Sequence, residues 1–197
     1  MIIGYKRPVG GEDAFWYAKF KGVDRKYIRM LAGLSLPILD RVSGAVVIIG
    51  ELYKQTGPQD LTALACKVGS WPEVENALTQ FRKDMKFDHV ICDREEAREV
   101  IFRMPGVHFG LNEIPLSTYT APEYACTEVG RAKTDQMIAE GRLHIEDATS
   151  QLDLEPEAGM RALCSVVIWA SDFSRAYYSP TRKREPGSGR ILGVEGL

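Results

Sequence analysis

Apolar and polar positions along the chain follow first a strand period and then a helix period. Three runs rich in aliphatic and β-branched residues, separated by turn residues, predict strands at 34–40, 45–54 and 61–68. A short glycine-containing turn joins the first two runs, so these strands should pair antiparallel. Apolar residues then recur at helical spacing after Ser70, which forms a capping-box pattern with Glu73.

The second half of the chain alternates short apolar runs with helical segments. We expect a strand at 88–93, a helix at 94–104, a strand at 107–114, one or two helices at 121–141, a brief extended piece at 142–147 and a long helix at 155–178. Three meandering strands followed by helix, strand, helix and strand are the order of the ribonuclease H-like topology. The predicted fold is therefore α/β, with an antiparallel three-strand meander extended by parallel strands and helices on both faces. Doubly wound nucleotide-binding folds begin strand–helix–strand instead, and no glycine-rich phosphate loop follows the first strand.

Composition narrows this picture only a little. The chain has 197 residues, 45% hydrophobic and 26% charged, with a net charge of -2, as in an ordinary globular domain. We expect an N-terminal extension at 1–33 that includes a short helix, a ribonuclease H-like domain at 34–178 and a mobile basic tail at 179–197. No apolar run is long enough to span a bilayer, and the four cysteines form no Cys-x-x-Cys pair. These features favour a cytoplasmic protein with buried free thiols.

Carboxylates at the ends of the central strands are the candidate chemistry. In this topology the first and fourth strands lie side by side, and they end at Asp40 and Asp93. Two neighbouring carboxylates repel each other unless a divalent cation lies between them. Mg²⁺ or Mn²⁺ held in this way suits phosphodiester hydrolysis. A third acid should come from the start of the last helix, where Asp153, Glu155 and Glu157 are available, and Glu157 is preferred because it lies nearest the apolar helix.

Each of these acids also has a plain structural explanation. Asp40 can be a turn residue of the hairpin, Asp93 can cap the helix that follows it, and acids at the start of the last helix can complement the helix dipole. Arg131 and Lys133 can contact phosphates near the site or remain solvated helix charges. The tail residues Arg182, Lys183 and Arg184 can contact DNA loosely or stay in solvent.

Four pieces of the chain, in this order, resemble a known family: "ILDRVSGAVVIIGELYK", "SWPEVENALTQFRKDMKFDHVICD", "GRLHI" and "EAGMRALCSVVIWA". They are similar to the C-terminal nuclease domain of the large terminase subunit of tailed phages, over about residues 34–170. The resemblance implies an endonuclease that cuts double-stranded DNA during genome packaging, with Mg²⁺ or Mn²⁺ held by Asp40, Asp93 and Glu157. It also implies a packaging ATPase domain, a portal or a small terminase subunit as partners.

Departures from the family pattern leave other functions open. The family often has Asp in its Gly-Met-Asp-Ala-Leu segment, where this chain has Arg161, and the glycines that follow the first Asp are reduced to Ser43-Gly44. The chain also carries no Gly-x-x-x-x-Gly-Lys-Ser/Thr motif of a motor. The alternatives are a Holliday-junction resolvase on the same fold and a non-catalytic binding or assembly module, in which Arg161 supplies positive charge where a metal would lie.

Overall fold

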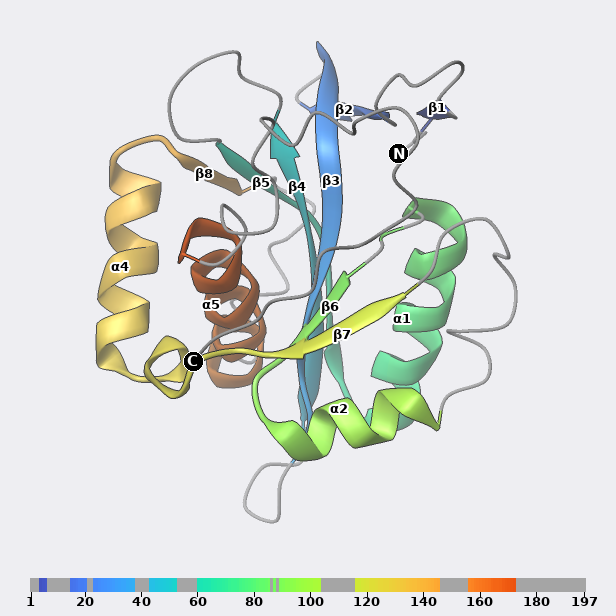
Figure 1. Ribbon diagram of the computed structural model, residues 1–197, viewed down its shortest axis with the longest axis vertical. Helices are drawn as coiled ribbons and strands as arrows, with labels where there is room; N and C mark the ends of the chain where they lie inside the picture. Colours follow the sequence, from blue (N-terminus) through green and yellow to red (C-terminus); the bar gives the residue numbers. More distant parts are fainter. Residues whose placement is uncertain are drawn as a thin grey trace, which may run out of the picture.

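A mixed eight-stranded sheet runs through the molecule, with helices on both faces (Figure 1). The computed structural model describes residues 4–6, 15–20, 23–37, 43–52, 60–85, 87, 89–103, 116–145 and 156–172. The strands are β1 (Gly4–Lys6), β2 (Phe15–Phe20), β3 (Val23–Ser35), β4 (Gly44–Leu52), β5 (Leu61–Gly69), β6 (His89–Cys92), β7 (Ser117–Thr120) and β8 (Leu143–Ile145).

Helices follow the strands in the predicted order. They are α1 (Trp71–Met85), α2 (Glu95–Phe102), the short 3₁₀ helix η1 (Glu123–Cys126), α4 (Glu128–Ala139) and α5 (Pro156–Asp172). None of these helices is long and apolar enough to cross a lipid bilayer within the ranges given above.

The strand order confirms the predicted fold class. β3, β4 and β5 form an antiparallel meander, β6 adds parallel to β3, and β7 adds parallel to β6. β8 pairs parallel with the outer edge of β5. A three-strand meander extended by parallel strands and covered by helices is the ribonuclease H-like arrangement.

β3 is the longest strand and organises the sheet. Its N-terminal half pairs with β2, and its C-terminal half pairs in parallel with β6 along the same edge, while β4 covers its other edge. The carboxyl ends of β3 and β6 therefore meet in the middle of the sheet, where ligands of open α/β sheets bind.

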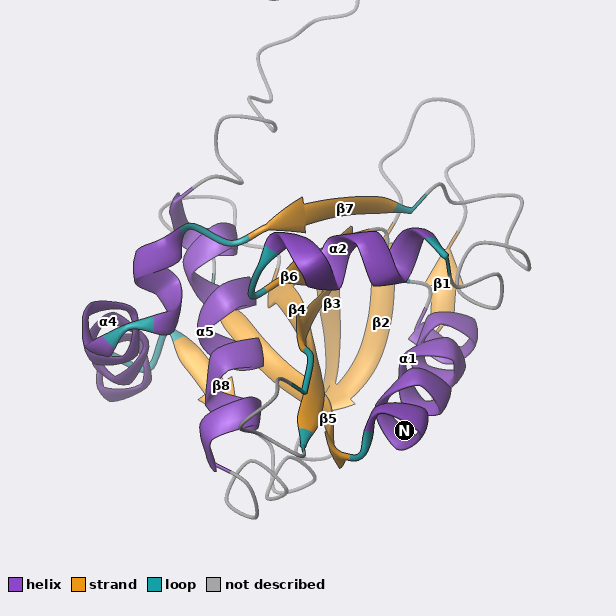
Figure 2. Cartoon of the chain, turned by 90° about the horizontal axis from the view of Figure 1, so that it is seen from below, coloured by secondary structure: helices purple, strands orange, loops and turns teal. Residues whose placement is uncertain are grey.

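Helices lie on both faces of the sheet (Figure 2). Two hydrophobic layers hold them to it. α1 and α2 pack on one face through residues such as Leu78 and Ile101, and α4 and α5 pack on the other through residues such as Met137 and Val166. Side chains of β3 and β4 alternate between the two layers, as the period of a strand requires. Three of the four cysteines are buried free thiols, as expected: Cys66, Cys92 and Cys164.

The first predicted strand is placed too late in the chain. The structure has β3 at Val23–Ser35, so the strand begins eleven residues before position 34 and ends before the turn. The described parts of residues 1–33 are strands, and the short helix expected there is not found in them. The mixture of aromatic and basic residues hid this strand, because its first half carries charged side chains in place of an apolar run. β3 therefore crosses the domain boundary expected at residue 33.

The described strand after α2, β7, was not predicted. It is formed by Ser117–Thr120, whereas the strand predicted at 107–114 lies outside the described residues. Thr118 is buried and the other three residues of the strand are half-buried. Its polar composition made it look like a turn.

Residues typical of helix ends form the expected capping contacts in the structure. The Glu73 carboxylate accepts hydrogen bonds from the Ser70 amide at 2.9 Å and from its hydroxyl at 2.7 Å, so the predicted capping pair forms. Gly141 follows α4 with a φ of +67°, and the Arg142 amide donates to the Met137 carbonyl at 2.9 Å. This is a Schellman motif.

Candidate functional site

The parallel register of β3 and β6 brings two polar residues together at the strand ends. Leu34 is paired with Cys92, and the Asp93 amide donates to the Leu34 carbonyl at 2.9 Å, which carries the ladder one step further. Ser35 and Asp93 therefore lie side by side, each at the carboxyl end of its strand.

Asp93 is the centre of this site. Its side chain is fully buried, and its Oδ2 accepts hydrogen bonds from the Ser35 hydroxyl at 2.9 Å and from Arg161 Nε at 3.2 Å. Its Oδ1 lies 3.9 Å from Arg94 Nε and accepts no hydrogen bond from the described residues. Asp93 does not cap α2, because Arg94 occupies the N-cap position without a side-chain capping bond. The carboxylate therefore serves this cluster of polar side chains.

Arg161 reaches Asp93 because α5 lies directly against β3. A Cβ on Gly33 would come within 2.1 Å of the Ala162 carbonyl oxygen, so only glycine allows the helix to come this close. The residue before Ala162 is Arg161, whose carbonyl accepts a hydrogen bond from the Ser165 hydroxyl at 2.7 Å. Close packing of backbone on backbone thus fixes the position of the Arg161 backbone, from which the side chain extends toward Asp93.

Arg94 adds a second guanidinium group at the same place. Its Nη2 donates to the carbonyls of Leu36 at 2.6 Å and Pro37 at 3.2 Å, the two residues that follow β3. The side chains of Arg94 and Arg161 stay 20% and 24% exposed, although the carboxylate between them is buried. The side chains of Arg94 and Arg161 are therefore partly exposed to solvent, whereas the Asp93 carboxylate beside them is buried.

Of the other predicted metal ligands, the structure describes only Glu157. Glu157 is exposed in the first turn of α5, four residues before Arg161 and so on the same side of the helix. Asp40 and the alternative acids Asp153 and Glu155 lie outside the described residues. Of the three predicted ligands, the structure thus places only Asp93 at the strand ends.

The described residues do not fit a metal ion as they stand. Nowhere in the described ranges do three or more His, Cys, Asp or Glu side chains gather in a way that could hold one. Mg²⁺ and Mn²⁺ need several oxygen ligands, with carboxylates to offset the ion's charge. Here the neighbour of Asp93 on β3 is a serine, and its neighbour on α5 is an arginine.

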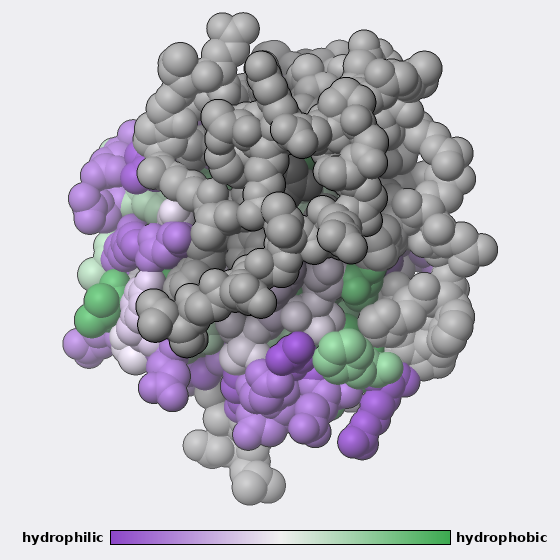
Figure 3. All heavy atoms as spheres, in the orientation of Figure 1, coloured by the Kyte–Doolittle hydropathy of each residue, from purple (hydrophilic) through white to green (hydrophobic). Residues whose placement is uncertain are grey.

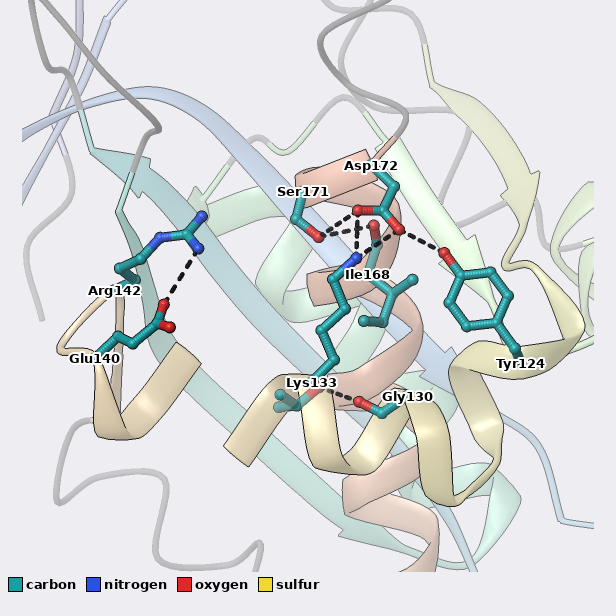
Figure 4. Close-up of polar contacts among 9 residues, drawn as sticks. Tyr124, Gly130, Lys133, Glu140, Arg142, Ile168, Ser171 and Asp172 are labelled. Atoms are coloured by element: carbon teal, nitrogen blue, oxygen red, sulfur yellow. Dashed lines mark hydrogen bonds and ion pairs between the residues drawn. The ribbon is translucent and has the colours of Figure 1, made fainter. Parts of the chain in front are cut away.

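Lys133, a predicted DNA contact, has a carboxylate partner (Figure 4). Its Nζ donates to both Asp172 oxygens, at 2.5 and 2.7 Å, and the Tyr124 hydroxyl donates to the same carboxylate. Burial works against ionisation of Asp172, but the hydrogen bonds from Lys133 and Tyr124 outweigh it and lower the pKa. The hydrogen bond to Asp172 raises the pKa of Tyr124 to about 12. This cluster ties η1 and α4 to the end of α5.

The remaining predicted DNA contacts are one helix residue and the tail. Arg131 is exposed on α4, and Arg182, Lys183 and Arg184 lie outside the described residues. Hydrophilic side chains cover α2 and much of α4 on the face seen in Figure 3. Among the few large apolar side chains exposed are Phe102 at the end of α2 and Val129 on α4. The described part of this face is therefore mainly polar.

Sequence reasoning did not single out Ser35 or Arg94. Ser35 could have been found if the first strand had been ended there, because the parallel register then puts Ser35 beside Asp93. Arg161 was noticed as a departure from the family pattern and as a positive charge at the expected metal position, and the structure shows it in contact with Asp93.

No protein-family model matches the chain, and no curated protein matches its sequence. Among solved structures, the chain is similar to one described as "Thermus thermophilus RuvC structure", with a TM-score of 0.44 and 12% sequence identity. The match covers 72% of this chain and 95% of that chain. A likeness of this strength carries no argument about residues or activity, so the fold class stands on the strand order described above.

Proposed function

We propose that this chain is a ribonuclease H-like module that binds double-stranded DNA, as a relative of the terminase nuclease domain working in phage genome packaging. The observation that carries the proposal is the pair of partly exposed guanidinium groups of Arg94 and Arg161 at the carboxyl ends of β3 and β6. This is the edge of the sheet at which an α/β fold of this kind binds its ligands.

Arg161 is well suited to contact a phosphate. Only its Nε is engaged, by Asp93, and neither of its terminal nitrogens makes a hydrogen bond with any described residue. Guanidinium groups present paired N–H donors that match the oxygens of a phosphate. Because Asp93 holds the side chain in place, little side-chain entropy is lost when a phosphate binds.

The expected contact at Arg161 is with the phosphate backbone of DNA. Binding through phosphates positions a protein on DNA but does not read sequence. We therefore expect weak, salt-dependent binding with little sequence preference.

The test is binding of a fluorescent DNA duplex, followed by anisotropy at several salt concentrations in EDTA. Arg161→Gln and Arg94→Gln should each weaken binding and lower the slope of log K against log salt by about one. Arg142→Gln is the matched control, because Arg142 is 31% exposed beside β8 and pairs with Glu140. Equal binding by all four proteins, or no binding by the wild type, would contradict the proposal.

The second candidate is the metal-dependent endonuclease, with Asp40, Asp93 and Glu157 as ligands of Mg²⁺ or Mn²⁺. One observation favours it: Asp93 Oδ1 is buried at the strand ends and accepts no hydrogen bond from the described residues. Nicking of supercoiled plasmid in Mn²⁺ by the wild type, and not by Asp93→Asn, would establish this activity. If nicking occurs, comparing a four-way junction with a linear duplex separates a junction resolvase from a packaging nuclease.

A further inference from the structure

We propose that Arg161 takes the place of a metal ion at this centre, so that the chain neutralises Asp93 with its own cation. The inference rests on the proposed function, because it states how the DNA-binding site works without a metal. It also predicts that this site binds the phosphodiester backbone but does not cleave it.

The contact geometry supports the replacement. The positive group lies against the buried oxygen, with Arg161 Nε 3.2 Å from Asp93 Oδ2. A guanidinium group is always charged in a protein, so it compensates a buried carboxylate at any pH at which the protein is folded. A buried carboxylate without such a partner costs several kcal/mol. Arg161 therefore compensates the charge of Asp93 without an ion from solution.

The partner on β3 supports the same conclusion. A shared metal ion would need a second acidic ligand close to Asp93, and among the described residues the one beside it on β3 is Ser35. Its hydroxyl donates a hydrogen bond to Asp93 Oδ2 at 2.9 Å and adds no negative charge. The two described residues whose side chains hydrogen-bond to the Asp93 carboxylate, Ser35 and Arg161, are thus both donors.

Packing keeps Arg161 in this place. Gly33 allows α5 to touch β3 at Ala162, the residue after Arg161, so the start of the arginine side chain cannot move away without opening the contact between helix and sheet. A metal ion entering the site would have to displace the Arg161 guanidinium group from Asp93. The ion would also meet a second positive charge at Arg94, 3.9 Å from Asp93 Oδ1.

The experiment measures Mn²⁺ binding directly, by the loss of the free-ion signal in electron paramagnetic resonance. The wild-type chain and Asp93→Asn should show the same binding curve, and the melting temperature of the wild type should be equal in EDTA and in Mn²⁺. The double variant Ser35→Asp with Arg161→Asp places two carboxylates beside Asp93. It should bind Mn²⁺ at least about tenfold more tightly than the wild type and melt higher in Mn²⁺ than in EDTA.

A matched control isolates the role of the original acid. Asp93→Asn added to the double variant should remove the new Mn²⁺ binding. Metal binding by the wild type that depends on Asp93 would overturn the inference, and so would a folded double variant that binds Mn²⁺ no better than the wild type. The wild-type comparison requires no substituted chain to fold other than Asp93→Asn, so a failure of the double variant to fold leaves the inference testable.

Failure of the proposed function gives a different result. DNA binding is measured in EDTA, where no metal contributes. A chain that binds neither DNA nor Mn²⁺ would contradict the DNA-binding function while keeping the role of Arg161. A chain that binds DNA and also binds Mn²⁺ through Asp93 would contradict the role of Arg161 alone.

Discussion

Asp93 shows how the surroundings of one residue decide its role. An Asp at the end of a buried strand in this topology predicts a metal ligand, and the same residue before a helix predicts a cap. In the structure it does neither within the described residues: its carboxylate is buried between Ser35 and Arg161. The sequence cannot distinguish these outcomes, because Arg161 lies far along the chain and only the packing of α5 on β3 brings it near.

The Asp93–Arg161 pair should be asymmetric in its contribution to stability. Arg161→Gln leaves a buried negative charge and should lower the free energy of unfolding by about 2 to 3 kcal/mol. Asp93→Asn should cost less, because Arg161 is 24% exposed and can turn its charge to water. The double variant Asp93→Asn with Arg161→Gln should be more stable than Arg161→Gln alone. Urea unfolding followed by circular dichroism gives all four values.

An exposed pair provides the control for this cycle. Arg98 and Glu95 form an i,i+3 ion pair on α2, with side chains 39% and 59% exposed. Arg98→Gln should change stability by less than about 0.5 kcal/mol. A loss for Arg161→Gln as small as that for Arg98→Gln would show that the Asp93 carboxylate does not depend on its arginine.

At the scale of elements, Gly33 determines how α5 sits on the sheet. A Cβ at this position would meet the Ala162 carbonyl oxygen at 2.1 Å and Val166 Cγ1 at 2.9 Å, and the first of these is backbone that cannot turn aside. Gly33→Ala should therefore push α5 away from β3, at a cost of about 1 to 3 kcal/mol or more. Near-ultraviolet circular dichroism should also change, because Trp169 on α5 lies against Tyr119 of β7.

Gly141→Ala separates this packing effect from backbone strain. Gly141 has a φ of +67°, and a Cβ there would meet nothing within 4 Å. Its replacement should cost about 1 kcal/mol through strain alone and leave the signal of Trp169 unchanged. An equal near-ultraviolet change in both variants would rule out displacement of α5 as the cause.

The tie between α4 and α5 should depend on pH. The pKa of Asp172 is lowered from its ordinary value of 3.8, with burial opposing the shift and the hydrogen bonds from Lys133 and Tyr124 causing it. A lowered pKa in the folded state stabilises the protein above the ordinary value, and this stabilisation is lost as the pH falls through the folded value. Wild type should thus be more stable than Asp172→Asn at pH 7, and the difference should shrink below about pH 4.

This prediction is checked by urea unfolding of both proteins at a series of pH values. Asp135→Asn is a suitable control, since Asp135 is an exposed acid on α4. A stability difference between wild type and Asp172→Asn that stays constant down to the lowest pH would show that the ion pair makes no contribution.

Elements whose apolar residues recur with a clear helix or strand period were predictable from the sequence. Elements in which polar and apolar residues are mixed without such a period were not. α1 was recovered from its apolar spacing and from Ser70 and Glu73 at its start. β7 was missed because Ser117–Thr120 is polar and depends on pairing with β6 for its conformation. The local sequence carries the first kind of information, and long-range pairing carries the second.

At the scale of the whole molecule, the order of elements was enough for the fold class but not for the site. Three strands, a helix, a strand and a helix lead to the observed sheet even though the first strand was placed several residues late. The prediction of the site residues is more sensitive to such an error in the bounds of a strand. Ending the strand at Asp40 in place of Ser35 changes which residue is expected beside Asp93, since each step along a strand turns the side chain to the other face.

The two hydrophobic layers should unfold together, because the same strands supply both. Ala32 and Ile48 point into the layer of α1 and α2, while their neighbours Leu31 and Ile49 point into the layer of α5. Loss of either layer uncovers one face of β3 and β4 and removes support from the other. We therefore expect a single cooperative transition, as in other small domains with one continuous sheet.

Two tryptophans test this expectation, one in each layer. Trp71 packs against the first layer and Trp169 is buried in the second, so each can serve as a fluorescent probe once the other and Trp16 are replaced by Phe. Both probes should report the same urea midpoint. Leu78→Ala, a cavity in the first layer, should lower both midpoints equally, with a loss of about 2 to 5 kcal/mol. If Trp169 kept its midpoint while that of Trp71 fell, the α5 layer with Arg161 and Asp93 would be stable independently of α1. The sheet would then not couple the two faces as its alternating side chains imply.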